Sequence, residues 1–332
     1  MIEFLKAMFT TWDLRPVVLI VPALFGIVYL RGWLHVNRMT SVRHARLQQG
    51  HITVDGRVLQ STQRRLASPW RLVSYFTGLA FLVLALASGF DVYGSLLFFV
   101  HMIQHQFLIM VAPPLLWLGN PYPFLMWGLP RRLRLPAGRL MTGSSPFRRT
   151  LSQIITPATV WIFLAATVWV WHDGRLYSLT LQNRIVHDLE HFTFFLAGML
   201  FAWQVTGATP WLRHPMSYLL RAGYVLSAAV PNMILGLGIT FASEPLFAYY
   251  TTVPRIWGIS VMTDQIYGGV IMLEEATMMY MVQALVLVGL HFQAEEAKAP
   301  LPPALWATDE AFRAPGFETP AVPSKPQSMN KA

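Results

Sequence analysis

The chain has 332 residues, of which 54% are hydrophobic and only 12% are charged. A soluble domain carries about 25% charged residues, so this composition excludes a soluble enzyme or a disordered protein and indicates a helical integral membrane protein. Cysteine is absent, which excludes disulfides, iron–sulfur clusters and thiolate metal sites. The net charge of +9 is interpreted as a signal for membrane orientation, and nucleic acid is not an expected partner.

Seven apolar segments approach the ~20 residues that cross ~30 Å of hydrocarbon. In chain order, the predicted spans are 17–33, 72–89, 92–118, 155–171, 187–205, 218–241 and 266–291. The predicted fold class is therefore all-α: a polytopic membrane helix bundle with seven transmembrane helices.

The basic residues are distributed unevenly between the two sets of alternating loops. Twenty lysines and arginines lie in residues 31–71, in residues 119–154, near Arg213 and in the C-terminal tail, whereas the opposite set holds five. Because cytoplasmic loops are enriched in Lys and Arg, this split predicts an outer N-terminus and a cytoplasmic C-terminus.

Three regions follow from this topology. Residues 1–16 form an outer N-terminal segment, and residues 17–291 form the membrane domain. An Arg-rich cytoplasmic loop over 34–70 interrupts that domain, and it serves either as a plain topogenic signal or as a contact to anionic membrane lipid. Residues 292–332 are rich in proline and are predicted to be a disordered cytoplasmic tail.

Ionisable side chains inside spans are costly and therefore mark candidate functional residues. The third predicted span contains His101 and His105, and the fifth contains His187 and His191. Residues four apart share one helical face, so each pair can contribute to one metal site. His172, Glu274 and Glu275 lie at a similar predicted depth, in the outer half of the bilayer. The candidate metal ligands are His101, His105, His187, His191, His172 and Glu274.

Several chemistries fit these residues. Imidazole with nearby methionine thioether and without thiolate favours copper, whereas paired histidines on different spans are also common haem ligands. The histidines can alternatively form hydrogen bonds between helices without any ligand. The run His187-Asp-Leu-Glu-His191 matches the weak pattern of inverted zinc proteases, with Glu190 as the base. Retinal is excluded because no span contains a lysine.

The His101-x-x-x-His105 run is followed by APPLLWLGNP over residues 112–121. Trp171-His172, the second histidine pair, GMLFAW over 198–203 and DQIYGGVIM over 264–272 accompany it. Together these motifs resemble the seven-helix CtaG family of cytochrome c oxidase assembly proteins over residues 70–290.

The resemblance implies a multi-pass protein of the bacterial plasma membrane that serves the maturation of a haem–copper oxidase by delivering copper. Oxidase subunits are then the expected partners, and no enzymatic activity is expected. The two histidine pairs, His172 and Asp264 are the matching polar positions. A haem-binding membrane redox protein and a metal-free assembly scaffold stay open as alternatives.

Overall fold

A computed structural model describes the backbone of residues 2–49, 53–54, 57–58 and 66–298, and the side chains of residues 6–40, 66–274 and 277–298. The chain divides into two units, Met1–Val288 and Gly289–Ala332. Within the described ranges the regular secondary structure is helical, apart from a short antiparallel hairpin of strands β1 (Thr53–Val54) and β2 (Arg57–Val58). The predicted disorder of the tail concerns residues that lie mostly outside these ranges.

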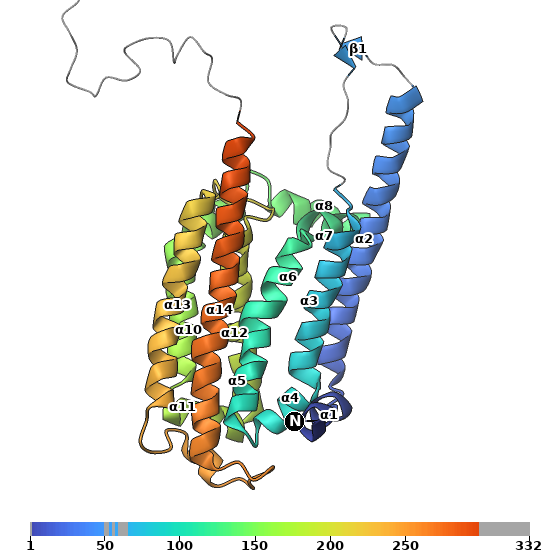
Figure 1. Ribbon diagram of the computed structural model, residues 1–332. Helices are drawn as coiled ribbons and strands as arrows, with labels where there is room; N and C mark the ends of the chain where they lie inside the picture. Colours follow the sequence, from blue (N-terminus) through green and yellow to red (C-terminus); the bar gives the residue numbers. More distant parts are fainter. Residues whose placement is uncertain (1, 50–52, 55–56, 59–65, 299–332) are drawn as a thin grey trace, which may run out of the picture. The chain divides into compact units, whose positions relative to one another are not determined.

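Six helices are long and apolar enough to cross a membrane, and a seventh is obtained if a bent helix pair counts as one span. The predicted all-α membrane architecture is confirmed at this level (Figure 1). The six spans lie in α2 (Pro16–Gln49), α3 (Pro69–Ala87), α5–α6 (Phe98–Leu118), α12 (Arg184–Thr206), α13 (Tyr218–Thr240) and α14 (Val261–Glu296). The bent pair is α9 (Pro146–Ile154) with α10 (Pro157–Trp171), which meet at 59°.

Shorter helices precede or connect these spans. They are α1 (Ile2–Thr10), α4 (Gly89–Gly94), α7 (Pro121–Gly128), α8 (Arg131–Leu140), α11 (Gly174–Gln182) and the 3₁₀ turn η2 (Ala248–Thr251). Large apolar side chains on the spans are exposed, among them Val17 at 73% and Ile20 at 62%. In a bilayer these faces contact lipid, because there the surrounding solvent is itself apolar.

The third span is a composite of α5 (Phe98–Gln106), the π-helical turn η1 (Phe107–Val111) and α6 (Ala112–Leu118). Pro113 and Pro114 have no backbone N–H, so the α-helical bonds to the carbonyls four residues earlier cannot form. The helix widens before them, and the N–H of Ala112 bonds the carbonyl of Phe107. Such π-turns occur often at functional sites, and this one begins two residues after the second histidine of the α5 pair.

This composite span is the central helix of the Met1–Val288 unit. Along its most apolar stretch 67% of the residues are buried, against 22–39% along the corresponding stretches of the other five spans. Helix α12 packs against it closely: a Cβ on Gly198 would lie 2.6 Å from the carbonyl oxygen of Ile109. Glycine at this position therefore lets the two histidine-bearing helices approach each other.

The structure differs from the predicted organisation at the first span. Helix α2 continues past Trp33 to Gln49, into the segment predicted as a loop. Residues such as Arg38, Leu47 and Gln48 are good helix formers, so the helix persists where the apolar run ends. The third span also starts later than predicted, because residues 89–94 form the separate helix α4.

Candidate metal centre

Four ionisable side chains from two helices converge inside the Met1–Val288 unit. His101 and His105 come from α5, and Glu190 and His191 come from α12; one potential ligand atom from each lies within 4.8 Å of the other three. All four residues are buried, with His101 and Glu190 at 0% exposure. We call these four residues the inner cluster.

The distances inside the inner cluster are close to those between donors around one metal ion. His101 Nε2 lies 3.4 Å from His191 Nε2 and 3.8 Å from Glu190 Oε2, and His105 Nε2 lies 3.6 Å from Glu190 Oε1. Metal–ligand bonds of 2.0–2.2 Å in a tetrahedral site place neighbouring donors about 3.3–3.6 Å apart. Three imidazoles and one carboxylate therefore surround a point at suitable distances for a transition-metal ion.

Hydrogen-bond direction determines which nitrogen of His101 carries the proton. The hydroxyl of Tyr250 donates to the carbonyl of Gly94 at 2.7 Å, so the hydroxyl of Tyr177, 3.0 Å away, must donate to Tyr250. The oxygen of Tyr177 then accepts from His101 Nδ1 at 2.7 Å. His101 is thus protonated on Nδ1, and its Nε2 lone pair faces the cluster. Burial raises the pKa of both phenols well above the usual value, so both keep the protons that this chain requires.

The other cluster residues carry buried polar atoms without hydrogen-bond partners among the described residues. These atoms are both ring nitrogens of His105, both carboxylate oxygens of Glu190 and Nδ1 of His191. Buried polar groups are almost always hydrogen-bonded, since an unpaired one costs free energy. Phe194 stacks on the His105 ring at 4.2 Å between centroids and holds its orientation without satisfying either nitrogen. A bound cation would coordinate one ring nitrogen of each histidine and a carboxylate oxygen of Glu190.

His172 lies beside the inner cluster and not in it. Its Nδ1 donates to the carbonyl of Val168 at 2.7 Å, and its Nε2 lies 3.4 Å from the sulfur of Met102. His172 and Met102 line a cavity of about 20 Å³ next to His105. The structure thus places this predicted ligand in the surroundings of the cluster, with a thioether as its partner.

The acidic residues of α14 do not join the inner cluster. Glu274 is exposed on the helix surface, and the side chain of Glu275 lies outside the described part of the chain. Asp264 is fully buried, but its carboxylate accepts hydrogen bonds from the backbone N–H groups of Phe98 and Phe99 at 3.0 Å and pairs with Arg255 at 2.8 Å. It therefore caps the N-terminus of α5 and positions the first turn, where His101 lies.

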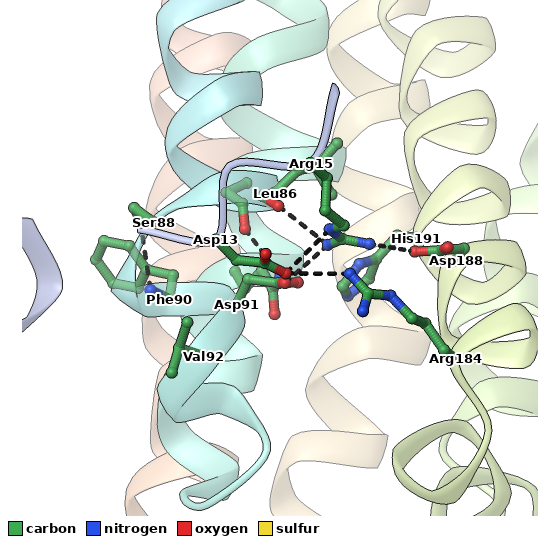
Figure 2. A network of polar contacts seen from close by, with 12 residues as sticks. Asp13, Arg15, Leu86, Ser88, Phe90, Asp91, Val92, Arg184, Asp188 and His191 are labelled. Carbon is green, nitrogen blue, oxygen red and sulfur yellow. Dashed lines mark hydrogen bonds and ion pairs between the residues drawn. The ribbon is translucent and has the colours of Figure 1, made fainter. Parts of the chain in front are cut away.

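His187 belongs to a second group, which it forms with Asp91 of α4 and with His191. Asp91 is bound by Arg15, which comes from the segment between α1 and α2 (Figure 2). The guanidinium of Arg15 also contacts Asp188 at 2.6 Å and Asp13 at 3.4 Å. Burial raises the pKa of Asp91, although Arg15 and the amide of Gln104 oppose that shift. Burial alone would lower the pKa of Arg15, but the surrounding carboxylates outweigh it and the net shift is upward.

The sequence predicted the histidine pairs, but it named Glu190 only as the base of a protease pattern and did not name Asp91. Residues 187, 190 and 191 are spaced i, i+3 and i+4, so they share one helical face, and this spacing could have identified Glu190 as a ligand. No local signal marks Asp91, Tyr177 or Arg15, because each lies in a short connecting segment whose position is set by packing.

Comparisons with known proteins agree with this architecture. The family model described as cytochrome c oxidase caa3 assembly factor (Caa3_CtaG) matches residues 55–293. An uncharacterized protein of Mycobacterium bovis is 29% identical over 212 residues, which cover 62% of this chain and 32% of the relative. An uncharacterized protein of Mycobacterium leprae is 28% identical over 218 residues, with 63% and 32% coverage.

The chain spans about one third of the length of these relatives. No solved structure gives a significant match. The family model covers most of the chain and includes both histidine pairs, and the chain belongs to the caa3-type cytochrome c oxidase assembly factor family.

Proposed function

We propose that this protein binds copper in the inner cluster and delivers it to a subunit of a haem–copper cytochrome c oxidase during assembly. The observation that carries the proposal is the convergence of three imidazoles and one carboxylate, all buried, in which His105, Glu190 and His191 carry buried polar atoms without hydrogen-bond partners. Imidazole ligands suit copper, zinc, iron and nickel. Copper is the one of these ions that a haem–copper oxidase requires beyond its haem iron.

The haem alternative fits the site less well. Two axial histidines need a planar macrocycle between them, and sites for ligands of that size occupy about 300 Å³ or more. The cavity beside His105 has a volume of about 20 Å³, and the rings of His101 and His105 lie 4.3 Å apart. This geometry supports a single ion.

A carrier must release its cargo, and the composition of the cluster supports exchange. Two of its residues come from each helix, so no single helix holds the ion alone. We infer that the protein acts without catalysis: it stabilises the ion, excludes solvent from it and transfers it by ligand exchange to the oxidase.

The charge distribution supports an orientation in which the N-terminus lies outside and the C-terminus lies in the cytoplasm, in a bacterial plasma membrane. The segment Gly89–Gly94 and helix α11, which adjoin the cluster, then lie on the outer side. At the other end, a groove of about 970 Å³ is lined by four arginines and Trp127. Arginine and tryptophan at an interface suit anionic lipid headgroups, which supports membrane lipid as a second partner. The four arginines are Arg31, Arg38, Arg131 and Arg134.

The test compares the double variant H101A/H105A with the control H214A/H291A, which removes two imidazoles outside the inner cluster. The H101A/H105A protein should be purified without bound copper. Cells that express it at a near wild-type level should lose most of their oxidase activity. The control should retain both properties. A metal-free scaffold, or histidines that only bond between helices, predicts normal oxidase activity in H101A/H105A, and that result would refute the proposal.

A further inference from the structure

A second group of potential ligands adjoins the inner cluster. Asp91, His187 and His191 each offer one atom, and these atoms lie within 4.8 Å of one another. We call these three residues the outer group. His191 belongs to both sets, is 3% exposed, and has no hydrogen-bond partner at Nδ1 among the described residues. The His187 ring lies 4.1 Å from that of His191 and 5.3 Å from that of His101, between centroids.

Exposure increases stepwise from the inner cluster through this group to the surface. The side chains of His101 and Glu190 are 0% exposed, that of Asp91 is 10% exposed, and that of Asp188 is 55% exposed. Arg184, at 63%, lies at the same rim and contacts Asp13 at 3.1 Å. The outer group thus lies between the buried donors and the surface of the protein.

Arginine side chains pair with the carboxylates at the surface end of the outer group, which we call the rim. Three carboxylates, from Asp13, Asp91 and Asp188, face two guanidinium groups, from Arg15 and Arg184, which leaves a net charge of −1 when all are ionised (Figure 2). The guanidinium of Arg15 lies 2.7 Å from Asp91, which is the acidic member of the outer group. Arg15 therefore competes with any metal ion that binds the carboxylate of Asp91.

We propose that the outer group is a second cation site, through which a copper ion reaches and leaves the inner cluster, and that Arg15 is the competing cation that closes it. The proposal rests on copper binding by the inner cluster. On arrival, the ion forms bonds to Asp91, His187 and His191, and the guanidinium of Arg15 shifts to Asp188 and Asp13. The ion then exchanges Asp91 and His187 for His101, His105 and Glu190 while it stays on His191. No electron is transferred. On arrival the ion exchanges water ligands for the outer group; in the second step its bonds to Asp91, to His187 and to one retained water break as the bonds to His101, His105 and Glu190 form.

A purely structural role for the ion pairs predicts different behaviour. The N-terminal segment already contacts the α3–α4 connection through the backbone bond from Asp13 to Ala87 at 2.9 Å. If Arg15 and Asp91 served only to hold this segment, removing either would loosen the same contact, and both changes would act in the same direction. Competition for Asp91 predicts opposite effects.

The experiment uses the full-length protein purified in detergent, with Cu(II) as the probe. Rates of loading are measured by rapid mixing, and rates of extraction are measured with an excess of EDTA. D91N and H187Q remove ligands of the outer group, and H187Q leaves the Arg15 pairs intact. R15Q removes the competing cation. E244Q, an exposed acidic position in the loop that follows α13, is the matched control for loss of one carboxylate.

We expect D91N and H187Q to load and release copper at least tenfold more slowly than wild type, R15Q to load severalfold faster, and E244Q to match wild type. Wild-type rates in H187Q, or slower loading in both D91N and R15Q, would overturn the outer site while copper binding by wild type still supports the inner one. If wild type itself retains no copper, the proposed function fails first and the outer site fails with it.

Discussion

Replacing Tyr177 with Phe tests whether the hydrogen-bond chain from Gly94 to His101 prepares the inner cluster for metal. The ring of Tyr177 is fully buried and packs against Phe247 at 4.4 Å between centroids, so phenylalanine preserves the packing. Only the hydroxyl is lost, and with it the acceptor for His101 Nδ1–H. His101 can then carry its proton on Nε2, the nitrogen that faces Glu190 and His191.

The size of the effect follows from these contacts. A buried donor left without an acceptor costs about 1–3 kcal/mol. Removing the partner that orients a metal-binding histidine lowers metal affinity by about 10–100-fold, which corresponds to about 1.4–2.7 kcal/mol. We therefore expect Y177F to bind Cu(II) about 10–100-fold more weakly than wild type, with a small loss of thermal stability.

Copper affinity is measured by competition with a chelator of known affinity on detergent-purified protein. ¹⁵N NMR of histidine-labelled protein reports the tautomer of His101, which should be Nδ1–H in wild type without metal. The control is Y249F. It removes a phenol hydroxyl from Tyr249, which precedes Tyr250 in η2 and contacts the Tyr250 ring. A folded Y177F protein with wild-type copper affinity would refute the role assigned to this chain, as would an Nε2–H tautomer in wild type.

Two further predictions concern the frame around the site. D264A removes the acceptor of two backbone N–H groups and the partner of Arg255, so it should lower the free energy of unfolding by about 3–5 kcal/mol, as for breaking a buried ion pair. D264N keeps a carbonyl acceptor and should lose less stability. An unchanged thermal midpoint in D264A would contradict the capping role. For the orientation, a reporter that is active only in the cytoplasm should work after Ala332 and fail between Asp173 and Leu181, and activity at the latter position would reverse the topology.

The histidine pairs illustrate what local periodicity can predict. An i,i+4 spacing on an apolar helix fixes that His101 and His105 share a face, whatever the rest of the fold does. Apolar length likewise predicts the spans, because the bilayer sets the number of residues required to cross it. The membrane class and the pairing of histidines within each helix were thus determined by the sequence alone.

The boundaries of the elements depended on chemistry that a hydropathy window does not resolve. Helix α2 runs past the apolar segment, since good helix formers follow it, and the π-turn η1 arises from two adjacent prolines acting on the carbonyls before them. Both effects can be traced to the sequence once the backbone hydrogen bonds are known.

Only the tertiary structure decided which groups meet. Helix α12 approaches η1 at Gly198, and this contact places Glu190 and His191 beside His101. Tyr177 and Arg15 come from connecting segments, and they lie 76 and 173 residues from the partners that they bind, His101 and Asp188. Contacts over such separations have no periodic signal in the chain, because they result from the packing of whole helices. That packing therefore determines which nitrogen of His101 carries the proton and which carboxylates Arg15 binds.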